Sequence, residues 1–232
     1  MSNSRMYFLD NLRSFIIMLM VVFHAALAYM IYAPEWWYVM DKQRSLFFDL
    51  FVVFADNFIM PIMFFISGYF GIKSLIKRTT SDFWSDKFKR IIVPWVFGAM
   101  LIAPIIAFLT PASRYIPIGF AEFYKTLFWG PYYQHAHYWY LGFLVVLYIL
   151  LTVAYKINPK IGEISNNISS PSFIFFLTTG LLGALGYWGV NLFIPDSLWV
   201  HPFWLVVFQA TRVPLFLIYF SLGVYAHNKQ WF

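Results

Sequence analysis

Six apolar stretches, each long enough to cross a bilayer as a helix, dominate this chain. They cover residues 14–33, 46–72, 91–110, 138–157, 172–194 and 203–226. A helix needs ~20 mostly apolar residues to cross the hydrocarbon core of a membrane. Hydrophobic residues make up 61% of the sequence and charged residues only 11%, whereas about 25% of the residues in a soluble domain are charged. The sequence therefore predicts an all-α, polytopic transmembrane helix bundle with six spans.

The basic residues predict the orientation of this bundle. On the side of the two termini the basic residues are Arg5, Arg13, Lys73, Lys77, Arg78, Lys87, Lys89, Arg90, Lys156, Lys160 and Lys229, whereas the opposite side carries Lys42, Arg44, Arg114 and Lys125. Because cytoplasmic loops are enriched in Lys and Arg, both termini are predicted to face the cytoplasm. The net charge of +6 then reflects topology and membrane lipid rather than binding to nucleic acid.

The chain has no recognisable internal repeat and no soluble segment, so residues 1–232 are expected to form a single membrane domain. Aromatic residues gather just outside the spans, as in the interfacial belts of membrane proteins. The sequence contains no cysteine. Disulfides, thiolate catalysis and cysteine metal sites are therefore excluded within this chain.

Two ionisable residues of the first span, Arg13 and His24, are predicted to share one helix face. Their separation of eleven residues corresponds to about three turns, or ~16 Å along the axis. An ionisable group at membrane depth is costly and indicates a functional site. The simpler alternatives are a positive-inside anchor for Arg13 and a hydrogen bond to a backbone carbonyl for His24.

Two further charged residues are expected near the depth of His24. If the second and sixth spans begin at residues 46 and 203, Asp56 and Arg212 lie ~15 Å and ~13 Å inside their helices. The three groups would meet at mid-membrane if their helices are neighbours. Asp56 could then orient His24, or form a hydrogen bond with Asn57 instead. Arg212 could pair with Asp56 as a structural bridge, or stabilise an oxyanion.

Four short motifs follow one another along the chain. Residues 5–14, with Leu-Asp-Asn-Leu-Arg at positions 9–13, precede His24; residues 61–70 read Pro-Ile-Met-Phe-Phe-Ile-Ser-Gly-Tyr-Phe; residues 87–90 read Lys-Phe-Lys-Arg; and residues 137–141 read His-Tyr-Trp-Tyr-Leu. In this order they resemble the acyltransferase 3 family of integral-membrane acyltransferases. That family has a Leu-Asp-x-Leu-Arg start, an Arg-x10-His pattern in the first helix and a Phe-Phe-x-Ser-Gly-Phe element. The branch that this chain most resembles is that of the glucan-modifying succinyltransferases.

The resemblance implies a membrane domain of about ten helices, of which this chain would be the N-terminal part. It also implies an O-acyltransferase of the bacterial inner membrane. An acetyl or succinyl group would move from cytoplasmic acyl-CoA, a substrate rather than a bound cofactor, to a hydroxyl of an extracytoplasmic glycan. In this interpretation His24 is the general base, since imidazole is suited to proton transfer near neutral pH. Arg13, Lys87 and Arg90 would hold the phosphates of the donor.

Other interpretations stay open at the level of sequence. Lys87 and Arg90 could be ordinary topology charges or a site for anionic lipid. His137 could line an acceptor site, whereas His135 is predicted to be an interfacial residue. The two cannot share a helix face for a metal, and no metal site is expected. The buried charges and the glycine-rich fifth span would also suit a transporter or channel, and a non-catalytic scaffold is a third possibility.

Overall fold

The computed structural model describes residues 6–34, 36–165 and 170–232, so Arg5 of the first motif lies outside the described residues. The helices are α1 (Tyr7–Ala26), α2 (Leu46–Lys77), α3 (Thr80–Lys87), α4 (Val93–Phe97), α5 (Ala103–Ser113), α6 (Phe120–Thr126), α7 (Trp139–Ile157), α8 (Phe173–Asn191) and α9 (Val213–Asn228). Strands β1 (Trp199–Val200) and β2 (Phe208–Gln209) form one short antiparallel pair. The prediction of a helical bundle is confirmed.

Five helices of the described chain are long and apolar enough to cross a membrane: Tyr7–Tyr29, Leu46–Lys77, Thr80–Ser113, Ala136–Ile157 and Phe173–Asn191. They correspond to the first five predicted spans. The sixth prediction is wrong in its extent, because residues 203–212 form turns and β2, and α9 begins only at Val213. Phe203 and Trp204 have φ angles of 53° and 58°, a left-handed conformation that a continuous helix cannot contain.

The first and third helices begin earlier than predicted. α1 starts at Tyr7, so Arg13 lies in its second turn and His24 in its last turn, and the depth of His24 in a membrane stays a prediction. α3, α4 and α5 form one continuous helical segment that includes two π-helical stretches, Phe88–Ile92 and Gly98–Ile102. The hydroxyl of Thr79 caps the start of this segment by accepting from the Asp82 N–H at 3.1 Å. Lys87 and Arg90 therefore lie on a helix and not in a loop.

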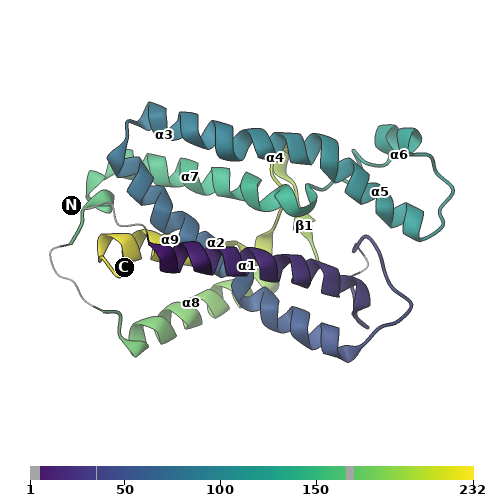
Figure 1. The fold of residues 1–232 in the computed structure, drawn as a ribbon, viewed down its shortest axis with the longest axis horizontal. Coiled ribbons are helices and arrows are strands. Elements are labelled where there is room, and N and C mark those ends of the chain that lie inside the picture. Colours follow the sequence, from purple (N-terminus) through teal and green to yellow (C-terminus); the bar gives the residue numbers. More distant parts are fainter. Residues whose placement is uncertain (1–5, 35, 166–169) are drawn as a thin grey trace.

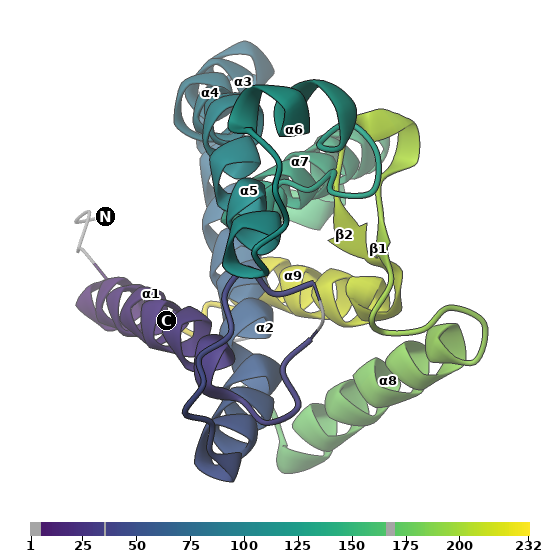
Figure 2. The same cartoon turned by 90° about the vertical axis from the view of Figure 1, so that its right-hand side faces the viewer.

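The closest helix pair in the bundle is α2 with α9. A Cβ atom at Gly68 would overlap the carbonyl oxygen of Phe220, and one at Gly223 would overlap that of Phe65. Small residues let two membrane helices approach to backbone contact in this way. In Figure 2, α9 crosses α2, while α8 lies apart from α1 and α2 and packs along α9. Only 6% of the most apolar stretch of α8 is buried inside the structure, so this helix presents most of its surface to the surroundings.

The two ends of the bundle differ in structure. The start of α1, the end of α9 and the junction of α2 and α3 lie at one end of the bundle (Figure 1). The helix α6 and the loop that follows α1 lie at the other end. The buried carboxylate of Asp49 fixes the loop after α1 by accepting from the backbone N–H groups of Ile31 and Tyr32, each at 2.9 Å. This loop forms part of the wall of the candidate site.

Candidate active site

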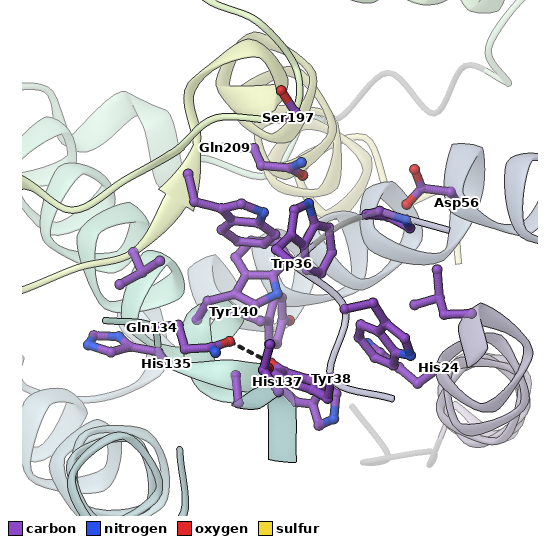
Figure 3. Close-up of a pocket in the computed structure, with 18 of the residues that line it drawn as sticks. His24, Trp36, Tyr38, Asp56, Gln134, His135, His137, Tyr140, Ser197 and Gln209 are labelled. Atoms are coloured by element: carbon purple, nitrogen blue, oxygen red, sulfur yellow. Dashed lines mark hydrogen bonds between the residues drawn. The ribbon is translucent and has the colours of Figure 1, made fainter. Parts of the chain in front are cut away.

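A cavity of about 730 Å³ opens within the loop-bearing end of the bundle. Its walls come mainly from α1 and the loop that follows it, α2, the residues on both sides of the start of α7, and the segment from Asp196 to Phe216. Four of the predicted site residues line this cavity, namely His24, Asp56, His137 and Arg212, and so does His135. Tertiary structure therefore brings together side chains of four separate segments; Figure 3 labels all of them except Arg212, with His24 and Asp56 on the two helices that flank the cavity.

His24 is held in one orientation by its own helix. Its Nδ1 lies 2.7 Å from the carbonyl oxygen of Met20, and because a carbonyl only accepts, Nδ1 must carry the proton. Nε2 is then the basic nitrogen, and it has no hydrogen-bond partner among the described residues. The ring stacks on Trp37 at 5.8 Å and meets the edge of His137 at 4.2 Å. A hydrogen bond to a backbone carbonyl is the simplest role for a histidine in a membrane helix. Here the same hydrogen bond leaves Nε2 unprotonated and able to accept a proton.

Asp56 and Arg212 are partners, as one of the sequence alternatives proposed. Arg212 Nη1 lies 2.6 Å from Asp56 Oδ2. The position of Arg212 differs from the prediction, since it immediately precedes α9 instead of lying inside a long span. No hydrogen bond joins Asp56 to His24 among the described residues, so a role of Asp56 in orienting His24 stays a prediction.

Asp196 completes this charged group, although no sequence motif pointed to it. Arg212 Nη2 lies 3.2 Å from Asp196 Oδ2, and the Thr211 hydroxyl donates to Asp196 Oδ1 at 2.7 Å. Burial opposes ionisation of the Asp196 carboxyl, but the hydrogen bonds from Arg212 and Thr211 outweigh burial and lower its pKa. The signal available in the sequence was modest: a single acidic residue between the fifth and sixth apolar stretches, close to an arginine that needed a counterion.

His135 is a buried histidine, and its prediction as an interfacial residue stays untested, because burial inside the protein does not fix its depth in a membrane. It is 2% exposed. Trp95 Nε1 donates to His135 Nδ1 at 3.2 Å, which leaves the proton on Nε2 to be donated to Tyr133 Oη at 2.9 Å. Tyr133 in turn donates to the carbonyl oxygen of Trp204 at 2.5 Å. Burial, with a smaller effect of nearby His201, lowers the pKa of His135 to about 4, so the ring is neutral at ordinary pH.

The three residues predicted to bind the donor do not line the cavity. Arg90 is 78% exposed and its Nε lies 2.9 Å from Asp86 Oδ1. Lys87 is 13% exposed, with its ammonium group 5.0 Å from the ring centre of Phe83 and 4.9 Å from that of Tyr148. Arg13 is exposed on α1. Arg13 lies in the second turn of α1, Lys87 ends α3, and Arg90 lies in the π-helical stretch that follows α3. Within the described parts of the chain, no group of three or more His, Asp or Glu side chains could hold a metal ion.

Known proteins similar to this chain agree with the family resemblance seen in its motifs. A family model described as an acyltransferase domain matches residues 6–232. The glucans biosynthesis protein C of Escherichia coli O139:H28 is 26% identical over 245 aligned residues, which cover 98% of this chain and 60% of that relative. The protein of the same name from Escherichia coli K12 is 29% identical over 171 residues, covering 72% of this chain and 41% of the relative. The chain thus spans 60% or less of the length of these relatives. No solved structure matches it.

Proposed function

Because the chain belongs to the acyltransferase 3 family of membrane acyltransferases, we propose that it transfers an acyl group to a hydroxyl in the cavity lined by His24. The observation that carries this proposal is the state of the His24 ring. Its Nδ1–H is held by Met20, while its basic Nε2 is without a partner among the described residues of the cavity. A general base must have this arrangement before the acceptor arrives.

The proposed reaction uses His24 twice. Nε2 takes the proton of the acceptor hydroxyl as the oxygen attacks the carbonyl carbon of the acyl thioester. The carbon–sulfur bond then breaks, and the imidazolium returns the proton to the leaving thiolate. The products are an ester and the free thiol of coenzyme A, and the histidine is regenerated. General base catalysis of this kind contributes about 10²–10⁴-fold to the rate.

The walls of the cavity suit a polyhydroxylated acceptor. The exposed His137 ring beside His24 and the carboxylates around Arg212 offer both hydrogen-bond donors and acceptors. The names of the relatives refer to glucan biosynthesis, which supports a glucan or similar glycan as the acceptor and an acetyl or succinyl group as the acyl chain. Arg13, Lys87 and Arg90 would bind the phosphates of acyl-CoA at the opposite, cytoplasmic end of the bundle in a bacterial inner membrane.

The test compares histidines at the two ends of the bundle. The full-length protein in membranes receives labelled acyl-CoA and a glucan, and initial rates of acyl incorporation are measured for wild type, His24→Ala and His227→Gln. His227 packs near the end of α9 and contacts the ring of Tyr69. We expect His24→Ala to lose about 10²–10⁴-fold in rate, while His227→Gln stays close to wild type. A His24→Ala protein that folds and retains its full rate would refute the proposed function.

A further inference from the structure

The inner end of the cavity is a floor of largely apolar side chains. Met20 lies one helical turn beyond His24, Met60 one turn beyond Asp56, and Phe216 one turn beyond Arg212. Tyr140 completes this floor from the first turn of α7 and is labelled in Figure 3. Among these four residues, only Tyr140 carries a hydroxyl group.

The Tyr140 hydroxyl is bonded to α2. Its oxygen lies 2.7 Å from Ser67 Oγ and 3.3 Å from the carbonyl oxygen of Met63. Because the Met63 carbonyl can only accept, the Tyr140 proton points to it and the Ser67 hydroxyl donates to Tyr140. The Tyr140 proton therefore lies in the longer of the two hydrogen bonds, the one to Met63 at 3.3 Å. The position of Ser67 is fixed by its neighbour Gly68, because Gly68 lies in backbone contact with α9.

Beyond this pair, polar and charged groups continue toward the other end of the bundle. Tyr148 donates to the carbonyl oxygen of Ser67 at 3.2 Å, and the Lys87 ammonium lies 4.9 Å from the Tyr148 ring centre. Only ten residues of α2, about 15 Å of helix, separate Ser67 from the end of α2 at Lys77. Polar groups inside a membrane bundle mark routes for polar substrates.

We propose that the Ser67–Tyr140 hydroxyl pair closes the inner end of the cavity, and that the thioester arm of the acyl donor reaches His24 by displacing this pair. The proposal rests on the proposed function. Arg13, Lys87 and Arg90 do not line the cavity, whereas His24 does. The proposal explains how acyl-CoA held by these three residues can deliver its acyl group to His24. An arm with amide and thioester groups can take over the hydrogen bonds that the two hydroxyls lose, whereas the methionine and phenylalanine side chains of the floor have none to offer.

Thiol labelling tests the closure directly, because the chain contains no cysteine. The full-length protein, with any cysteine outside this chain replaced, receives Ser67→Cys and is treated with a charged methanethiosulfonate reagent. Ser197→Cys, at an exposed position of the cavity wall, is the reactive control, and Thr152→Cys, at a buried position of α7, is the unreactive one. We expect Ser67→Cys to react at least ~10-fold more slowly than Ser197→Cys, since reactivity scales with the open fraction.

Removing the Tyr140 ring should make the thiol of Ser67→Cys more accessible. Adding Tyr140→Ala should raise the labelling rate of Ser67→Cys by ~10-fold or more, and desulfo-coenzyme A should slow the labelling again. Labelling of Ser67→Cys that is unchanged by Tyr140→Ala, or unaffected by desulfo-coenzyme A, would overturn the proposal. Neither measurement requires turnover, so a failure here is distinct from a failure of the His24 assignment.

A matched pair of hydroxyl deletions supplies the kinetic test. Tyr140→Phe and Tyr148→Phe each remove one phenol oxygen bonded to α2, but only Tyr140 lines the cavity. Tyr140→Phe should change the KM for acyl-CoA by about 5-fold or more, with the KM for the glucan unchanged. Tyr148→Phe should leave both values within about 2-fold of wild type. Equal effects of the two variants on the KM for acyl-CoA would contradict a specific role for the pair.

Discussion

Arg212 Nη1 lies 2.6 Å from Asp56 Oδ2, and this ion pair joins the start of α9 to α2 beside the cavity. Arg212 also bonds to Asp196, in the loop between α8 and β1. One guanidinium therefore holds two carboxylates from separate segments. The pair stabilises the wall of the cavity in a region where unpaired charges are costly.

Removing the cation should destabilise the protein more than removing one anion. Arg212→Met leaves Asp56 and Asp196 close together without a counterion, and we expect a loss of about 3 kcal/mol. Asp56→Asn leaves Arg212 paired with Asp196, and the expected loss is about 1 kcal/mol. Thermal unfolding in detergent, followed by tryptophan fluorescence, compares the two. A larger loss for Asp56→Asn would show that the carboxylate has a more important partner than Arg212.

The close contact of α2 with α9 should tolerate no added methyl group. Gly68→Ala places a Cβ on the Phe220 carbonyl oxygen, and Gly223→Ala places one on the Phe65 carbonyl oxygen. Each change must push the helices apart, and we expect losses of about 1–3 kcal/mol or more. Gly180→Ala on α8 is the control, because no atom lies within 4 Å of its added Cβ. The fraction of monodisperse protein after extraction and its melting temperature measure the effect.

Stability should fall in mild acid because of His135. Its pKa is about 4 in the folded protein, against 6.5 for an exposed histidine. Above pH ~6.5 both states are neutral, and stability does not depend on this group. Between pH 6.5 and 4 only the unfolded state binds a proton, so the free energy of unfolding decreases by about 3 kcal/mol across this window and is constant below it. His135→Gln should flatten this part of the profile. An unchanged slope in that variant would assign the acid sensitivity to other groups.

Lys87 and Arg90 should respond differently to neutralisation. Arg90 is largely exposed, and its surface pair with Asp86 contributes only about 0.3–0.5 kcal/mol, so Arg90→Gln should leave stability unchanged. If it binds the donor phosphates, its loss should raise the KM for acyl-CoA by about 10-fold. Lys87 lies over two aromatic rings, and Lys87→Gln should lower the melting temperature as well. Parallel measurements of KM and thermal stability separate the two roles, and an unchanged KM for Arg90→Gln would remove it from the donor site.

The sequence predicted helices better than their ends. Hydropathy located the first five spans because the hydrocarbon core requires ~20 apolar residues of any crossing helix. It overestimated the sixth, since Phe203 and Trp204 are as apolar as helical residues while their backbone is left-handed. It also shortened the first, because Asp10 and Asn11 interrupt the apolar run without interrupting α1.

The candidate site was predicted in part. His24, Asp56, His137 and Arg212 were recognised from depth, spacing and motif, and all four line one cavity. Asp196 and Tyr140 were not assigned to the site, because an isolated aspartate and a tyrosine at a helix start carry no periodic signal. The burial of His135 between Trp95 and Tyr133 could not be predicted, because Trp95 is forty residues away in the chain.

The sequence by itself determined that the chain forms a helical membrane bundle and that it carries the motifs of an acyltransferase. Apolar length and local spacing are properties of single segments, and the bilayer acts on them directly. The tertiary structure alone decided which charges meet, that Asp56 pairs with Arg212, and that Tyr140 and Ser67 lie between the cavity and the basic end. These contacts depend on how closely the helices approach one another. Gly68 and Gly223 let the backbones of α2 and α9 touch because they have no side chain, and no single segment encodes that contact.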